Sequence, residues 1–167
     1  GSAESAYTIE ERDFVLQDDA QLIGSVTYDT SDGDCVLTLQ DRASITGELT
    51  IANKSGQSTS ARLVMKGDSV IHGKLLCSDN AVSFEMQDNA KIEGDLDVGN
   101  SKVSGKVTCT GDIIGGIFDR DGTVINNGRI IGGIFYGTVA GTGRIEDSAK
   151  VDVIFDTAGG SAVDTQK

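Results

Sequence analysis

The sequence predicts an all-β protein, a single-stranded right-handed parallel β-helix (a solenoid) of about seven coils. Three observations predict it. One six-position pattern recurs seven times along the 167 residues. The copies are separated by 17 to 26 residues, a spacing typical of solenoid repeats. The chain also has 22 Gly, no Pro and no Trp, which suits thin coils made almost entirely of hydrogen-bonded strand.

The repeat is clearest after Met86, where every second residue follows the order large apolar, Asp, Ala, Ile, Gly, large apolar. Alternation with a period of two indicates strands, with the patterned residues pointing inward. Unequal copies exclude the six-residue rhythm of a left-handed β-helix, so a right-handed coil with loops of variable length remains. The copies begin at Leu16, Leu39, Met65, Met86, Val107, Val124 and Ile145.

Stacking the seven copies predicts four further columns. A β-branched apolar column packs well on a pleated surface, and a column of small residues suits a corner. The glycine column is expected at a bend with unusual backbone angles. The predicted members are Ile45, Ile71, Ile92, Ile113 and Ile130 for the apolar column; Ala20, Ala43, Ser69, Ala90, Gly111, Gly128 and Ala149 for the small one; Gly24, Gly47, Gly73, Gly94, Gly115, Gly132 and then Val153 for the glycine column; and Val26, Leu49, Leu75, Leu96, Ile117, Ile134 and Phe155 for the last.

The domain organisation follows from where the pattern begins and ends. We expect residues 1–11 to form an N-terminal leader or cap, residues 12–157 the β-helix, and residues 158–167 a flexible C-terminal tail. The two longest steps place polar loops at Asp29–Asp34 and Asn53–Ser60.

The charge and the cysteines narrow the function classes. A net charge of −12 argues against nucleic acid and anionic membranes as partners, and no apolar run approaches the ~20 residues of a membrane span. Cys35, Cys77 and Cys109 are an odd number without CxxC spacing, which argues against a disulfide framework and a zinc site. Cys35 and Cys77 have inward parity, and Cys109 is expected to be partly exposed.

The segment Phe118–Val124 (F-D-R-D-G-T-V) resembles the first motif of haloacid-dehalogenase-like phosphatases. In that family the first Asp is the nucleophile and the second a general acid, which would be Asp119 and Asp121 here. The flanking G-G-I-F and G-T-V recur a few residues later, however, and Val124 falls on an inward column. The interpretation we favour is a turn within a repeat.

Two acidic sets are candidate Ca²⁺ ligands, although neither completes a twelve-residue calcium loop. They are Asp29, Asp32 and Asp34 in one loop and Asp119 and Asp121 in the other. A plain Asp/Gly turn is the alternative, and we favour it.

One acidic column could suggest an enzyme. Stacked carboxylates about 5 Å apart occur in glycoside-cleaving enzymes, but an acid that recurs coil after coil is typical of a residue that hydrogen-bonds the backbone at each turn. His72, the only His, has outward parity and no nucleophile set around it. We therefore predict no catalytic, cofactor-binding or metal-binding residue. The column contains Asp18, Asp41, Asp88, Asn126 and Asp147.

Two runs resemble known families of β-helix. Lys91–Gly116 (K-I-E-G-D-L-D-V-G-N-S-K-V-S-G-K-V-T-C-T-G-D-I-I-G-G) resembles bactofilins, bacterial cytoskeletal β-helices that polymerise end to end. Ile125–Ile145 (I-N-N-G-R-I-I-G-G-I-F-Y-G-T-V-A-G-T-G-R-I) is similar to repeats of large secreted bacterial surface proteins, which are adhesin-like β-helices.

The leading hypothesis is a non-catalytic β-helix module of a bacterial surface or secreted protein, an adhesin-like stalk or a surface that binds a glycan or a protein. The expected contact regions are the loop Asn53–Ser60 and a face at Phe135 and Tyr136. One alternative is a bactofilin-like filament subunit, located in the cytoplasm, that self-associates through its β-helix ends. The other is a carbohydrate-active enzyme or its binding module.

Overall fold

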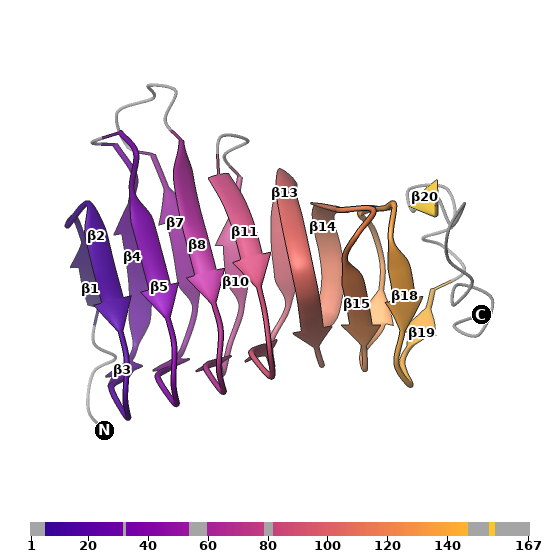
Figure 1. Ribbon diagram of the computed structural model, residues 1–167, viewed down its shortest axis with the longest axis horizontal. Coiled ribbons are helices and arrows are strands. Elements are labelled where there is room, and N and C mark those ends of the chain that lie inside the picture. Colours follow the sequence, from indigo (N-terminus) through magenta and orange to yellow (C-terminus); the bar gives the residue numbers. More distant parts are fainter. Residues whose placement is uncertain (1–5, 32, 54–59, 79–81, 147–153, 156–167) are drawn as a thin grey trace.

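The computed structural model describes residues 6–31, 33–53, 60–78, 82–146 and 154–155. These residues form a parallel β-solenoid of about six turns, and none of them is helical. In Figure 1 the chain runs down the near face and up the far face as it advances from the N-terminal to the C-terminal end, which is a right-handed coil. The predicted fold class is therefore confirmed, with about six turns where the sequence predicts seven.

The first four coils have three walls of parallel strands, which we name by their place in Figure 1. The far face contains β1 (Ala6–Ile9), β4 (Ser25–Asp29), β7 (Leu49–Ala52) and β10 (Leu75–Cys77). The near face contains β2 (Asp13–Leu16), β5 (Val36–Leu39), β8 (Ala61–Met65) and β11 (Val82–Met86). The lower edge contains β3 (Gln21–Ile23), β6 (Ser44–Thr46), β9 (Val70–Ile71) and β12 (Lys91–Ile92).

The later coils continue these walls with two long strands, β13 and β14, followed by six short ones. The long β13 takes part in all three walls and links the two halves of the rod. The strands are β13 (Leu96–Cys109), β14 (Asp112–Phe118), β15 (Thr123–Asn126), β16 (Arg129–Ile130), β17 (Ile134–Phe135), β18 (Thr138–Ala140), β19 (Arg144–Ile145) and β20 (Ile154–Phe155).

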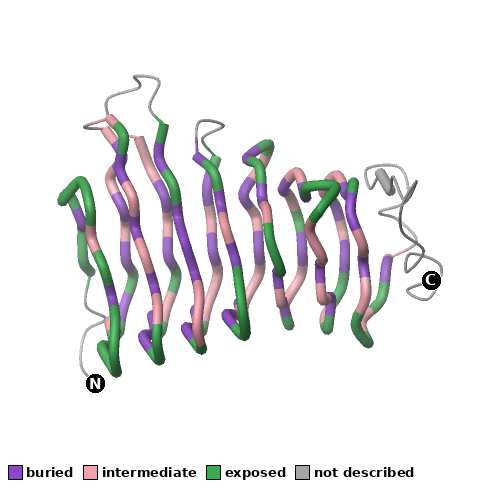
Figure 2. The backbone as a smooth tube through the Cα atoms, viewed as in Figure 1, coloured by how far each residue is buried: buried purple, intermediate pink, exposed green. Residues whose placement is uncertain are grey.

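Alternation along each strand builds a single apolar core. In β11, for example, Val82, Phe84 and Met86 are buried while Ser83 is exposed. Figure 2 shows the same alternation of buried and exposed residues along successive coils. Because each inward residue lies above its equivalent in the next coil, burial is shared along the whole rod, as solenoid repeats require.

The first four coils share a turn between the near face and the lower edge. Its second residue has a positive φ of 57° to 66°, at Asp18, Asp41, Gly67 and Asp88. Asp tolerates this left-handed conformation better than most residues, because its short side chain hydrogen-bonds locally. The turn is closed by a main-chain hydrogen bond. In the fourth coil Ala90 N donates to Gln87 O at 3.2 Å, and in the second coil Ala43 N donates to Gln40 O at 3.1 Å.

A glycine column runs the length of the rod because adjacent coils nearly touch there. A Cβ on Gly47 would lie 2.1 Å from the carbonyl oxygen of Gly24, and one on Gly73 would lie 2.1 Å from that of Gly47. Only the first two glycines of the column have a positive φ, so close approach of the backbones, rather than a bend, is what requires glycine in the others. The column is Gly24, Gly47, Gly73, Gly94, Gly111, Gly128 and Gly143.

The predicted columns are confirmed within the first four coils, but their continuation is wrong. Ile92 lies opposite Cys109, whereas Ile113 lies opposite Leu96 and Ile130 opposite Ile113. Gly111 and Gly128, predicted in the small-residue column, belong to the glycine column in place of Gly115 and Gly132. The later coils are shorter than the predicted alignment assumes: Gly94 to Gly111 spans 17 residues and Gly128 to Gly143 spans 15.

The final predicted column is also wrong beyond Leu96. Ile117 and Ile134 are only partly buried, and Phe118 and Phe135 point inward instead. Each pair follows two glycines, of which the second has a positive φ (Gly116, 141°, in the first case). Phe118 therefore comes five positions after Ile113, and Phe135 five after Ile130, and this odd step reverses the parity in the manner of a β-bulge.

Strands also occur near both ends of the predicted β-helix. β1 falls within the expected leader of residues 1–11 and pairs in parallel with β4. β20 pairs with β17, with Phe155 opposite Phe135. The expected tail, residues 158–167, lies outside the described residues. Within the part of the chain that is described, no helix is long and apolar enough to cross a membrane.

Candidate binding groove

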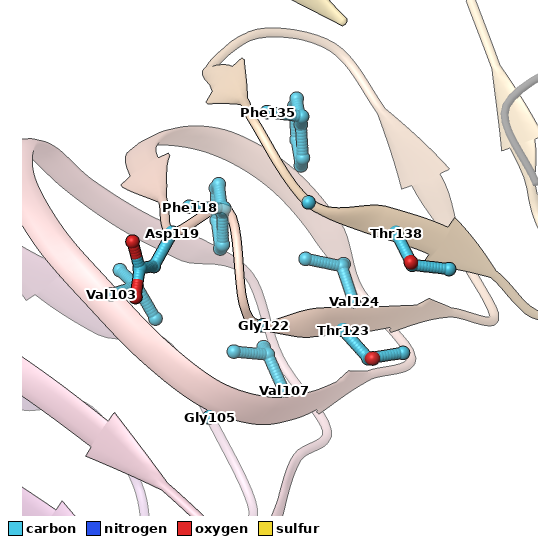
Figure 3. A pocket seen from close by; sticks show the side chains of 11 residues that line it. Val103, Gly105, Val107, Phe118, Asp119, Gly122, Thr123, Val124, Phe135 and Thr138 are labelled. Atoms are coloured by element: carbon cyan, nitrogen blue, oxygen red, sulfur yellow. The ribbon is translucent and has the colours of Figure 1, made fainter. Parts of the chain in front are cut away.

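The interior of the narrow coils is filled by side chains. Figure 3 shows Phe118 and Phe135 above Val103, Val107 and Val124. The two rings are stacked, with centroids 4.6 Å apart and planes 2° from parallel. The space between these coils has no room for a water molecule, so a ligand at this level has to bind on the outer surface.

Phe135 is thus not part of an exposed face, contrary to the sequence prediction. It is fully buried, whereas the neighbouring Tyr136 is 36% exposed. Of the loop Asn53–Ser60, the second predicted contact region, residues 54–59 lie outside the described residues.

Replacing Phe135 by Ala is expected to lower the free energy of unfolding by about 3–5 kcal/mol, because a large buried ring and its stacking contact with Phe118 are lost. Tyr136→Ala, one residue along the same chain, should cost less than about 1 kcal/mol, as surface substitutions do. Urea unfolding followed by circular dichroism measures both. A greater loss in Tyr136→Ala would contradict the observed orientation.

The recurring acids are bound to backbone amides of adjacent coils. Asp41 Oδ2 accepts a hydrogen bond from Asp18 N, and Asp88 Oδ2 accepts one from Gly67 N, both at 2.9 Å. Asn126 does not belong to this column, since it is fully buried opposite Cys109, and Asp147 lies outside the described residues. These carboxylates therefore close turns in the rod, which was the structural interpretation of their recurrence.

The two candidate calcium sets lie in turns. Asp29 Oδ1 accepts hydrogen bonds from the amide and hydroxyl of Ser31, while Asp32 lies outside the described residues. Asp119 Oδ1 accepts a 2.9 Å bond from Arg120 N, and Gly122 N donates to Asp119 O at 3.0 Å. Among the described residues, no three His, Cys, Asp or Glu side chains are grouped so that they could hold a metal ion.

The three cysteines are all buried, including Cys109, for which partial exposure was predicted. Cys77 lies opposite Ile51 in the far-face column. Cys109 replaces an isoleucine of the lower-edge column, and its burial raises the pKa of the thiol to about 12. A thiol with this pKa is protonated and inert at neutral pH.

His72 lies on the outside of the lower edge beside two charged residues. Its Nδ1 is hydrogen-bonded to Glu93 Oε1 at 2.5 Å, and Lys91 Nζ lies 3.5 Å from Glu93 Oε2. The hydrogen bond with His72 is the main cause that lowers the pKa of the Glu93 carboxyl below its usual range. All three side chains are more than a third exposed, so the pair contributes little to stability.

The Glu93 carboxyl should nevertheless leave a signature in the pH dependence of stability. Because its pKa is lower in the folded than in the unfolded chain, its contribution is present above the unfolded pKa and is lost as the pH falls through the folded pKa. Glu93→Gln should therefore lose less thermal stability than the wild type between about pH 5 and pH 3. Melting temperatures across this range test it, and parallel curves would contradict it.

The outer surface of the near face is hollowed where the coils narrow. A groove of about 440 Å³ lies over β11, β13, β14 and the residue after β17. Phe84 and Val103 are its buried floor. We call this the near-face groove; its lining residues are Ser83, Phe84, Glu85, Lys102, Val103, Ser104, Ile117, Asp119 and Tyr136.

The register explains how residues so far apart in sequence come together. Ser83 lies opposite Lys102, which lies opposite Ile117, and Glu85 lies opposite Ser104. The main-chain bond from Tyr136 N to Phe118 O (3.0 Å) continues the ladder across the last two coils. Ser104, one of the smallest lining residues, lies opposite the longer Glu85.

No protein-family model matches the chain, and neither the curated proteins nor the solved structures include one with significant similarity to it. The resemblances to bactofilins and to adhesin-like surface repeats therefore rest on the quoted residues alone. The near-face groove was not predicted as a site, although Tyr136 was named as a contact residue. Its remaining polar residues have outward parity in three different coils, a pattern shared by most of the surface.

Proposed function

We propose that the chain is a non-catalytic β-helix module of a bacterial surface or secreted protein, a stiff rod that displays the near-face groove to a ligand. The observation that carries this proposal is that the polar residues fall into two sets with different surroundings. The recurring acids hydrogen-bond backbone amides between coils, while the groove gathers polar side chains on the outside.

Links between coils support the proposed stiffness. Each coil is hydrogen-bonded to the next along its walls, and ion pairs cross the same gaps on the outside. Arg42 Nε lies 2.6 Å from Asp19 Oδ1, and Arg129 Nη2 lies 2.7 Å from Asp112 Oδ2. The hydrogen-bonded walls, more than these largely exposed ion pairs, let a solenoid hold its outward side chains at fixed spacing.

A filament subunit is the second candidate, favoured by the unpaired edges of the first described strands. Among the described residues, β1, β2 and β3 each pair with a strand on one side only, and unpaired edges invite another copy. The described coils differ in size, however: Gly24 to Gly47 spans 23 residues and Gly128 to Gly143 spans 15, and Figure 1 shows that the later coils are smaller.

Charge also opposes pairing of two N-terminal ends. Residues 1–50 contain 11 Asp and Glu against 2 Lys and Arg, so −9 of the net charge of −12 lies in this third of the chain. Two such ends would repel one another at moderate ionic strength.

Two measurements on the full chain test the proposal. Light scattering and electron microscopy are expected to show elongated monomers, and long regular filaments would favour the second candidate instead. A reducing-sugar assay over a panel of polysaccharides is expected to show no release. Sustained cleavage that disappears in Asp88→Asn would overturn the non-catalytic proposal.

A further inference from the structure

The near-face groove combines the groups that recognise a sugar ring. Tyr136, 36% exposed, offers an aromatic ring with a polar hydroxyl at its tip. Ser83 and Ser104 offer hydroxyls, Asp119 and Glu85 offer carboxylate acceptors, and Lys102 offers an ammonium donor. A pyranose needs both kinds of contact, because its C–H faces are apolar and its rim carries hydroxyls.

The groove is elongated along the solenoid axis. Its polar residues come from four successive levels of the near face, on β11, on β13, just after β14 and just after β17. Three steps of about 4.8 Å between strands give a length of roughly 14 Å. Such a length suits a few sugar units of an extended chain rather than a single compact metabolite.

The lining of the groove carries two carboxylates, on Glu85 and Asp119, and one ammonium, on Lys102. Arg62, outside the lining, balances the remaining charge, since its Nη2 lies 3.0 Å from Glu85 Oε1. The rest of the chain is strongly acidic, with a net charge of −12. A polyanionic chain would gain nothing locally and would be repelled overall, so a neutral ligand is favoured.

A peptide that adds a strand has no free edge to bind at this place. The β11 strand pairs with β8 and β13, and β17 pairs with β14 and β20. The groove is therefore bounded by side chains of a continuous sheet, whereas peptide recognition by strand addition requires an exposed backbone edge.

From these four observations we infer that the near-face groove binds a short stretch of a neutral linear saccharide lying along the solenoid axis. This inference rests on the proposed function and deepens it. The Tyr136 ring stacks on one sugar, while Ser104, Asp119 and Lys102 hydrogen-bond to hydroxyls of its neighbours.

Calorimetric titration of the full chain with cellotetraose, xylotetraose, mannotetraose and chitotetraose tests the inference, with trigalacturonic acid as the charged comparison. At least one neutral tetrasaccharide should bind, and more tightly than trigalacturonic acid. Tyr136→Ala should weaken that binding about tenfold or more, and Tyr136→Phe should retain it. Tyr7→Ala is the matched control, because Tyr7 is 38% exposed and lies at the far N-terminal end; it should bind as the wild type does.

The inference is overturned if no neutral tetrasaccharide binds at millimolar concentration, if Tyr136→Ala binds unchanged, or if Tyr7→Ala loses as much. A Ser104→Tyr variant separates this inference from the proposed function, since it fills the groove on an otherwise intact rod. If wild type and Ser104→Tyr were both retained equally on an immobilised glycan or protein panel, the groove assignment would fall while the display function would stand.

Discussion

Ile92→Asp is expected to abolish the folded rod or to destabilise it by at least about 3–5 kcal/mol, the cost typical of an uncompensated buried charge. Ile92 is fully buried and lies between Ile71 below and Cys109 above. Neither neighbour can neutralise or hydrate a carboxylate. Because coils in a solenoid support only their neighbours, the loss at this level should separate the rod into two weakened halves.

Urea unfolding followed by far-ultraviolet circular dichroism measures this effect. Lys91→Asp is the matched control, since it places the same side chain on the same strand but toward solvent, where Lys91 is 42% exposed. It should cost less than about 1 kcal/mol. Equal unfolding midpoints for the two variants would contradict the inward orientation of Ile92.

Gly73→Ala is the second large effect, expected at about 3 kcal/mol. Its Cβ would lie 2.1 Å from Gly47 O and 2.6 Å from Gly47 C. Both atoms belong to the backbone of the preceding coil, so relief requires the two coils to move apart and their hydrogen bonds to lengthen. The backbone angle is not the cause here, because the φ of Gly73 is not positive.

Gly33→Ala separates close approach from backbone strain. Gly33 has a φ of +108°, yet a Cβ there would meet nothing within 4 Å. Its substitution should cost only the conformational strain, about 1 kcal/mol. If Gly33→Ala were the more damaging of the two, close contact between coils would not be the reason for the glycine column.

Sequence reasoning located the strands well because inward and outward residues alternate. It placed Ile45, Ile71 and Ile92 in one column, as the ladder of the lower edge has them. It failed at the junction with the short coils. From Met86 to Ile92 the chain takes six residues, whereas the equivalent path from Gly105 to Cys109 takes four.

Removing an even number of residues leaves the alternation intact, so parity alone cannot reveal the missing turn. A coil that changes by an odd number of residues exchanges the inward and outward positions instead. The paired glycines before Phe118 and Phe135 add one residue, which moves the phenylalanines inward and the preceding isoleucines outward. The G-G pair was visible in the sequence, and its positive φ at Gly116 and Gly133 is the physical signal.

The near-face groove depended on these same shifts. Tyr136 lies near Ser104 and Glu85 only because the near-face steps are short: 19 residues from Phe84 to Val103, 15 from Val103 to Phe118 and 17 from Phe118 to Phe135. A column alignment that is displaced by two to four residues puts other side chains beside it. The outward orientation of most of the polar groove residues can therefore be predicted from the sequence. That they lie together on one surface follows only from the register between coils.

The register at this junction is tested most directly by scalar coupling across hydrogen bonds, measured by NMR on isotopically labelled protein. The amide nitrogen of Thr110 should couple to the carbonyl carbon of Ile92, and that of Asn127 to the carbonyl carbon of Cys109. The reason is that these amides donate hydrogen bonds to the corresponding carbonyl oxygens, with N to O distances of 3.0 and 2.9 Å. Coupling of the Ile92 carbonyl to the amide of Ile114 would instead place Ile113 opposite Ile92, and would contradict both the short coils and the groove that they form.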